Sequence, residues 1–420
     1  MKHLLPKHTT QSEWPIGSSN KQTSIAALYA HGTYCSGQRL ASEIVIKGLQ
    51  ERNWNVHSIR LPALERKTTN QRIKINILLI SILNATPVLL YAWLQVLRLK
   101  PEYILYVSLG QTKFSMMREG IPFVLRYFFN NRKTTGIISL HGSNFMTWQY
   151  KDLEAKFLRM ISGSANLISV LGPNQVTQLK ELGITPNKIF VADNTCLIDS
   201  LNISRIKQKH TQTLTLNRPL NILFLSNLLE EKGYIQFIEA AYILSKEARE
   251  THRKLNFILC GKTIFSDNAN LRFSNPELAQ NWIKSQIKEI NQSSQISLQW
   301  IDGAIGLQKQ ELFHQAHVFV FPSQYKTEAQ PLVILEALAS GCAVLTSRIG
   351  EIPSTVNEQT AYFLNDCLPQ TIAQSVTEIA NDEIKRITLA VNGLNLFQSR
   401  FSYQQHINRW EDLLQQLDSP

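Results

Sequence analysis

The chain has 420 residues, of which 44% are hydrophobic and 18% charged, a composition that excludes an intrinsically disordered protein and predicts two or three folded domains. Its net charge of +11 is uneven, because residues 1–195 carry 23 Lys and Arg against 10 Asp and Glu, and the remaining residues carry 20 against 22. A basic half can bind nucleic acid, an anionic membrane or an acidic substrate, or can be an ordinary soluble face. The lack of zinc-finger spacing, of a ribonucleoprotein aromatic motif and of a basic helix-turn-helix pattern argues against nucleic acid.

In chain order, residues 1–23 are polar and lack the apolar core of a signal peptide, which indicates a flexible tail. From residue 24 onward, short apolar runs alternate with helical patterns, as in parallel sheets with crossover helices. The expected strands of the first half are Ile25–Ala30, Val56–Ile59, Tyr103–Val107, Gly136–Leu140, Leu167–Leu171 and Ile189–Ala192. The expected helices are Gln38–Glu51, Phe114–Phe129, Leu153–Ile161 and Pro173–Leu182.

Residues 75–97 form a stretch of 23 residues without a charge, which is long enough to span a bilayer. Pro87 divides this stretch into two shorter pieces, so a true span is disfavoured. A buried core helix is one interpretation. A segment lying on a membrane surface is the other, since basic residues flank both ends.

The polar segment 201–218 separates the two halves and is interpreted as a hinge. The α/β pattern then restarts, with expected strands Asn221–Ser226, Leu255–Cys260, Ile296–Trp300, Val318–Phe321 and Ala343–Thr346. The expected helices are Gly233–Ser245, Pro276–Ile290, Gln308–Gln315, Pro331–Ser340 and Pro369–Ile379, followed by a helical C-terminal tail. We therefore predict a first domain over residues 24–200, a second over 219–395, and a C-terminal helix over 396–420.

The five cysteines are widely spread and contain no C-x-x-C pair or zinc spacing. They are interpreted as reduced thiols of a cytoplasmic protein.

The most informative motif lies in the second half. Glu328 and Glu336 are eight residues apart, where a turn enters a helix that ends near Gly341. Two turns of helix place both carboxylates toward one cleft. The helix start at Pro331, Leu332 and Val333 offers backbone N–H groups to an anionic ligand.

These residues resemble the E-x7-E element of retaining glycosyltransferases with two Rossmann-like domains, the GT-B architecture, and glycosyltransferase family four in particular. The resemblance implies an α/β fold with two domains facing a cleft and C-terminal helices that cross back to the first domain. It also implies that Glu336 binds the ribose of a nucleotide sugar and that Glu328 binds its sugar.

Lys232, in the segment Ser226–Gly233, matches the family's lysine that neutralises the donor diphosphate. Such a fixed ammonium stabilises the charge that develops on the leaving group. Asn227 occupies the position of the family's arginine, where it can donate a hydrogen bond but carries no charge. Arg348 and Lys326 are candidate replacements for the missing cation.

Gly37, in the loop after the first strand, resembles the family's glycine that lets backbone amides approach the donor. An ordinary tight turn is the alternative. His141 ends the fourth strand and matches the family's first-domain histidine that contacts the transferred sugar. At its ordinary pKa an imidazole can donate or accept a proton near neutral pH.

No Asp-x-Asp triplet occurs, so no cofactor or metal is expected. The sequence predicts a retaining, metal-independent enzyme that moves a sugar from a nucleotide donor to an acceptor hydroxyl. The expected acceptor is a lipid-linked saccharide in surface polysaccharide or glycolipid synthesis. An anionic membrane surface is a further expected partner, on the inner face of the plasma membrane. The alternatives are a scaffold of the same fold that binds without turnover, and a phosphorylase or epimerase of the same architecture.

Overall fold

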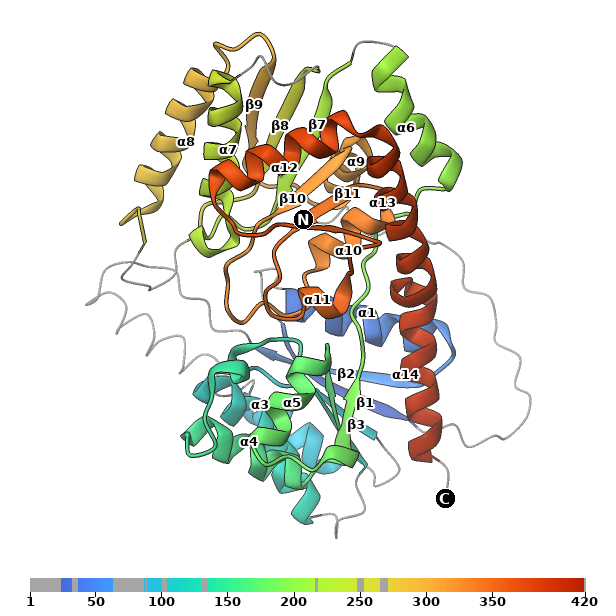
Figure 1. Cartoon of the computed structure of the whole chain (residues 1–420). Helices are drawn as coiled ribbons and strands as arrows, with labels where there is room; N and C mark the ends of the chain where they lie inside the picture. The colour runs from blue at the N-terminus through green and yellow to red at the C-terminus, as the bar shows by residue number, and fades with distance from the viewer. Residues whose placement is uncertain are drawn as a thin grey trace.

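The computed structural model describes residues 24–31, 37–62, 87, 89–99, 104–129, 135–215, 218–247, 253–264 and 271–418. The expected tail and residues 75–86 lie outside these ranges. Two six-stranded parallel sheets, each covered by helices, form two α/β domains one above the other (Figure 1).

The first sheet has the strand order β2-β1-β3-β4-β5-β6. Its strands are β1 (Ile25–His31), β2 (Val56–Pro62), β3 (Ile104–Ser108), β4 (Gly136–Ser139), β5 (Leu167–Val170) and β6 (Ile189–Val191). Its helices are α1 (Gly37–Glu51), α3 (Lys113–Phe129), α4 (Leu153–Gly163) and α5 (Pro173–Glu181), with short turns η1 (Asn144–Thr147) and η2 (Pro186–Lys188). Residues 89–98 are also helical.

The second sheet has the order β12-β11-β10-β7-β8-β9. Its strands are β7 (Leu220–Leu225), β8 (Leu255–Cys260), β9 (Ile296–Ile301), β10 (Val318–Phe321), β11 (Ala343–Thr346) and β12 (Tyr362–Phe363). Its helices are α7 (Tyr234–Lys246), α8 (Pro276–Ile290), α9 (Gly306–Gln315), α10 (Leu332–Ala339), α11 (Ile352–Thr355) and α12 (Pro369–Asn381), and η3 (Glu230–Lys232) follows β7.

In each sheet, successive strands of the chain are added first on one side of the starting strand and then on the other. This switch point lies between β1 and β3 in the first domain and between β7 and β10 in the second. Open parallel sheets bind ligands at the carboxyl ends of the strands beside such a switch point. The loops that follow these four strands are therefore the expected ligand-binding loops.

The C-terminal helices join the domains, as predicted. The chain runs through α13 (Glu383–Leu396) and η4 (Phe397–Phe401) into α14 (Tyr403–Asp418), which extends beside the first domain in Figure 1. Trp410, Leu413 and Leu414 of α14 are buried against the first-domain residues Ala27 and Tyr106. This confirms the expected return of the C-terminus to the first domain.

The segment expected as a hinge is mostly helical. It forms α6 (Ile203–Thr215), and Ile206 is buried with Ala390 and Leu394 of α13. The domain boundaries drawn from the sequence stay predictions. Among the described helices, none is long and apolar enough to cross a membrane.

Candidate functional site

The centre of the candidate site is an ion pair at the switch point of the second sheet. Lys232 follows β7 and Glu328 follows β10, so the two residues leave neighbouring strands at the same edge. Lys232 Nζ donates to both carboxylate oxygens of Glu328, at 2.8 Å to Oε1 and 2.6 Å to Oε2. Both side chains are largely shielded from solvent, with 16% and 7% exposed. The sequence predicted both residues as site residues but not their contact.

A glycine next to Lys232 brings the two strand ends together. Gly233 has φ of +87°, and a Cβ there would lie 2.3 Å from the carbonyl oxygen of Pro322. A side chain at this position would push the turn after β7 away from the end of β10.

The backbone and carboxylate of Glu328 are held from two sides. Ser323 Oγ donates to Glu328 Oε2 at 2.8 Å, and the backbone N–H of Glu351 donates to the carbonyl of Glu328 at 3.0 Å. Gly350, with φ of +56°, passes so close that a Cβ would lie 2.0 Å from the same carbonyl. The loop after β11 therefore fixes the position of Glu328.

Glu336 forms a second ion pair on the inner side of α10. Lys309 Nζ, on α9, donates to Glu336 Oε1 at 2.5 Å. Glu336 Oε2 is buried and has no hydrogen-bond partner within the described part of the chain. Burial raises the pKa of Glu336, and Lys309 opposes that shift. A ligand hydroxyl could satisfy the unpaired oxygen. Lys309 was not predicted as a site residue, because it stands in the polar run Gln308-Lys309-Gln310.

The helix start differs by one residue from the prediction. Pro331 is the N-cap, and α10 begins at Leu332, with Val333 beside it half-buried. Both apolar side chains pack against the core of the second domain. The expected backbone N–H groups thus stand at the helix N-terminus, between Glu328 and Glu336.

The candidate replacement cations do not join this centre. Arg348 pairs with Glu358 at 2.8 Å and lies over the ring of Phe363 at 4.0 Å. Lys326 and Asn227 are exposed, with no side-chain hydrogen bond in the described ranges. Lys232 is therefore the cation that the structure brings to Glu328.

His141 is buried where the two domains meet. Its Nε2 lies 3.0 Å from Ser139 Oγ and 3.1 Å from the hydroxyl of Tyr106. Burial, with a smaller contribution from the neighbouring His406 of α14, lowers the pKa of His141 to about 3. The imidazole stays neutral at physiological pH, so the expectation that it titrates near neutrality is wrong. Gly37 is the first residue of α1, and its role stays a prediction.

A cavity of about 360 Å³ lies at the switch point of the first sheet. Its walls include Tyr29 of β1, Ser108 of β3, and Gly142 and Asn144 after β4. Gln111 also lines it. The side-chain amide of Gln111 accepts from the N–H of Phe145 at 3.2 Å, while its Nε2 is buried without a partner among the described residues. Hydroxyl and amide groups of this kind pair well with sugar hydroxyls. This cavity was not predicted, because its residues come from separate segments of the chain.

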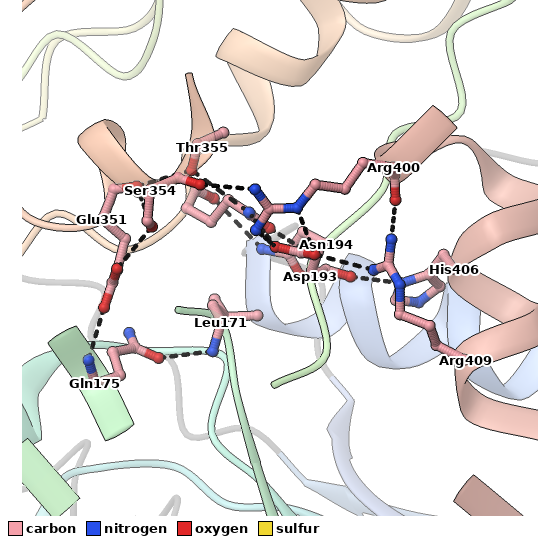
Figure 2. A network of polar contacts seen from close by, with 11 residues as sticks. Leu171, Gln175, Asp193, Asn194, Glu351, Ser354, Thr355, Arg400, His406 and Arg409 are labelled. Atoms are coloured by element: carbon pink, nitrogen blue, oxygen red, sulfur yellow. Dashed lines mark hydrogen bonds and ion pairs between the residues drawn. The ribbon is translucent and has the colours of Figure 1, made fainter. Parts of the chain in front are cut away.

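A polar network ties the domains together around Asp193, which follows β6 (Figure 2). Arg400 of η4 donates to both Asp193 carboxylate oxygens, at 3.0 Å from Nε and 2.8 Å from Nη2. Arg409 of α14 lies 3.2 Å from the same carboxylate, and the backbone carbonyl of Asp193 accepts from His406 at 2.7 Å.

The same network also includes residues that lie next to the candidate site. Gln330, two residues after Glu328, donates to Asp193 Oδ1 at 2.9 Å. Glu351 accepts from the backbone N–H of Gln175 on α5 at 2.6 Å and from Ser354 at 2.8 Å. Figure 2 shows the contact of Glu351 with Gln175, which joins the two domains. The loop that fixes Glu328 is therefore anchored on the first domain.

Two facing Rossmann-like domains with crossing C-terminal helices define the GT-B fold, and solved structures support it. Anabaena HepE in complex with UDP aligns over 93% of this chain and 100% of that chain, with a TM-score of 0.63 and 14% identity. Sucrose-phosphate synthase from Thermosynechococcus elongatus aligns over 94% of this chain and 99% of that chain, with a TM-score of 0.62 and 16% identity. At these identities the likeness shows the fold, which confirms the predicted fold class.

Sequence comparisons identify the second domain. Residues 206–395 match the model of the family "Glycosyl transferases group 1". Over 102 residues the chain is 31% identical to the capsular polysaccharide biosynthesis glycosyltransferase CapM of Staphylococcus aureus. The aligned residues make up 24% of this chain and 26% of that protein. The match thus spans about a quarter of the curated relative. The part of the chain that matches this family contains Lys232, Glu328 and Glu336.

Proposed function

We propose that this protein transfers a sugar from a nucleotide-sugar donor to a hydroxyl group of a saccharide acceptor, retaining the anomeric configuration and requiring no metal. The observation that carries the proposal is the contact between Lys232 and Glu328 at the switch point of the glycosyltransferase domain. An ammonium and a carboxylate, 96 residues apart in sequence, meet where a parallel sheet binds its ligand.

Each site residue has a role in this proposal. An ammonium has three N–H donors. Lys232 directs two at Glu328, and the third is available to a phosphate oxygen of the donor. The N-terminus of α10 adds partial positive charge. Glu328 accepts hydroxyls of the transferred sugar, and Glu336 Oε2 accepts a ribose hydroxyl.

The reaction breaks the bond between the anomeric carbon and the diphosphate and forms a bond to the acceptor oxygen. The proton of the acceptor hydroxyl passes to the departing diphosphate, whose negative charge Lys232 stabilises. His141 stays neutral, so it positions the sugar through hydrogen bonds. The metal-free mechanism accords with a centre whose positive charge comes from Lys232 and a helix terminus.

The acceptor is proposed to bind in the first domain, in the cavity that Gln111 and Ser108 line. The S. aureus relative CapM is a glycosyltransferase of capsular polysaccharide biosynthesis. A growing or lipid-linked saccharide in surface polysaccharide synthesis is therefore the proposed acceptor class.

A panel of UDP-, GDP- and ADP-sugars tests donor binding by thermal stabilisation. We expect at least one donor to raise the melting temperature, since a ligand at 100 times its Kd stabilises the native state by about 2.7 kcal/mol. Glu336→Ala should weaken that donor by about 10- to 100-fold, because hydrogen bonds to charged groups contribute about 1.5–3 kcal/mol. Glu311→Ala, an exposed change on α9, is the matched control.

A measurement of product formation distinguishes a glycosyltransferase from a scaffold that only binds the donor. A scaffold would be stabilised by a donor without transferring or hydrolysing it, and Asn227 at the expected arginine position is the observation in its favour. If no donor stabilises the protein, the proposed function fails. A requirement for inorganic phosphate would indicate a phosphorylase instead.

We also propose that the first domain rests on an anionic membrane. The helix of residues 89–98 buries Ala92 and Val96, while Leu90, Tyr91 and Leu94 on its other face are 52%, 63% and 47% exposed. An exposed apolar face on a basic domain is typical of interfacial helices.

Co-sedimentation with phosphatidylglycerol vesicles at low salt tests the membrane proposal. We expect the wild-type protein to sediment and the variant Leu90→Gln/Tyr91→Gln/Leu94→Gln to lose most of this binding. Ile384→Gln removes an 82% exposed apolar side chain from the second domain and should change nothing. Equal binding by all three proteins, or none by the wild type, would contradict the proposal.

A further inference from the structure

A second cavity, of about 620 Å³, lies at the opposite edge of the second domain's sheet from Lys232 and Glu328. It lies at the amino ends of the strands, because Asn221 stands at the start of β7 and His317 directly precedes β10. Three of its lining residues are cations: Arg205 and Lys209 on α6, and Arg218 before β7. Its walls, as far as the structure describes them, contain no Asp or Glu.

Burial lowers the pKa of Lys209, and no carboxylate of the described residues compensates its ammonium. Its Nζ donates to the carbonyl oxygens of Ala316 at 2.7 Å and Ser340 at 2.8 Å. Across the described ranges, Lys209 forms no salt bridge. Two carbonyl dipoles stabilise an ammonium less than an anion does, and a shielded, uncompensated charge is costly. A negative group in the cavity would remove that cost.

Two further guanidinium groups face the same space. Arg205 and Arg218 are exposed, and neither forms an ion pair with any described residue. Other described surface arginines of this domain are paired, as Arg272 is with Glu239 and Arg348 with Glu358. Planar guanidinium groups bind phosphate oxygens through two parallel hydrogen bonds.

The histidines of the cavity hold its walls in place. His317 Nδ1 accepts from the N–H of Asn221 at 3.0 Å, and its Nε2 donates to the carbonyl of Lys209 at 3.2 Å. His314 Nε2 lies 2.9 Å from the carbonyl of Asp199, in the chain segment that enters from the first domain. These contacts fix α6 against the start of the sheet. The cation cluster is therefore built into the fold.

We propose that this cavity binds a soluble ligand with two or more phosphate groups, at a site separate from the cleft between the domains. Three cations match a diphosphate, and a volume of about 620 Å³ is within the range of about 300–1,000 Å³ for small-molecule sites. A diphosphate held by Arg205 and Arg218 links α6 to the first strand of the domain. The bound ligand thereby stabilises the connection between the two domains.

Titration with inorganic pyrophosphate, followed through the ring NMR signals of His314, tests this site without interference from the cleft. The His314 signals are assigned with His314→Gln. We expect saturable shifts in the wild-type protein and at least tenfold weaker binding in Arg205→Gln/Arg218→Gln. Lys207→Gln, an exposed charge on α6 outside the cavity, is the matched control and should bind as the wild type does.

Several outcomes would overturn the proposal. These are an absence of shifts at His314, equal affinity in the double variant, or an equal loss in Lys207→Gln, which would indicate diffuse attraction by charge. A second titration uses vesicles that contain phosphatidic acid in place of pyrophosphate. Shifts with the vesicles but not with pyrophosphate would assign the site to a lipid headgroup and overturn the soluble ligand.

Discussion

Replacing Lys232 by methionine is expected to lower the rate of sugar transfer by about 10²- to 10³-fold, the loss that follows removal of one preorganised donor from a developing anion. Methionine keeps most of the length of the side chain but removes the ammonium that contacts Glu328 at 2.6 Å. The departing diphosphate then gains its charge without a fixed cation beside it. Initial rates at saturating donor measure the effect, and Lys246→Met on the exposed surface of α7 is the control.

Loss of Lys232 also leaves Glu328 buried without its cation, so stability and activity must be separated. Glu328→Gln in the same protein removes the orphaned charge. The double variant Lys232→Met/Glu328→Gln should therefore recover part of the melting temperature that the single variant loses. Its transfer rate should stay low. Recovery of activity together with stability would show that the ion pair has only a structural role, and would contradict the proposed mechanism.

Most strands could be predicted from the sequence because a parallel strand is buried on both faces and forms a continuous apolar run. Val318–Phe321, the strand β10, is fully buried over its whole length. The strand β12 was not predicted, since its two residues Tyr362 and Phe363 are only half-buried. The polar segment 201–218 gave no sign of α6, whose Ile206 packs against residues about 180 positions later.

The residues of the candidate site could be predicted from the sequence, but the ion pairs that they form could not. Spacing and neighbouring residues indicated Glu328, Glu336 and Lys232. The cation beside Glu336, Lys309, belongs to another helix and is placed there by the packing of α9 on α10. Such pairings depend on strand order and helix packing, which a local pattern does not contain. The contact of Asp193 with Arg400, 207 residues apart, was missed for the same reason.

The ion pair between Asp193 and Arg400 is expected to contribute strongly to the stability of the folded protein. Asp193→Ala is expected to destabilise the protein by about 3 kcal/mol, within the lower part of the range of about 3–5 kcal/mol for breaking a buried ion pair. The Asp193 side chain is 7% exposed, and its loss leaves Arg400 and Arg409 without their shared carboxylate. Since Arg400 is 36% exposed, water offsets part of the cost. Thermal unfolding measures the change, with Asp412→Asn, an exposed change on α14, as the control.

The same variant should lower transfer activity even where it remains folded. Asp193 accepts from Gln330, two residues beyond Glu328, so its loss releases the loop that carries the site from the C-terminal helices. Closure of two domains completes such a site and excludes water. We expect a smaller kcat and a more extended particle in small-angle scattering, with donor affinity nearly unchanged because Lys232 and Glu336 stay in the second domain. Wild-type kcat in a folded Asp193→Ala protein would show that the network stabilises the domain interface without contributing to catalysis.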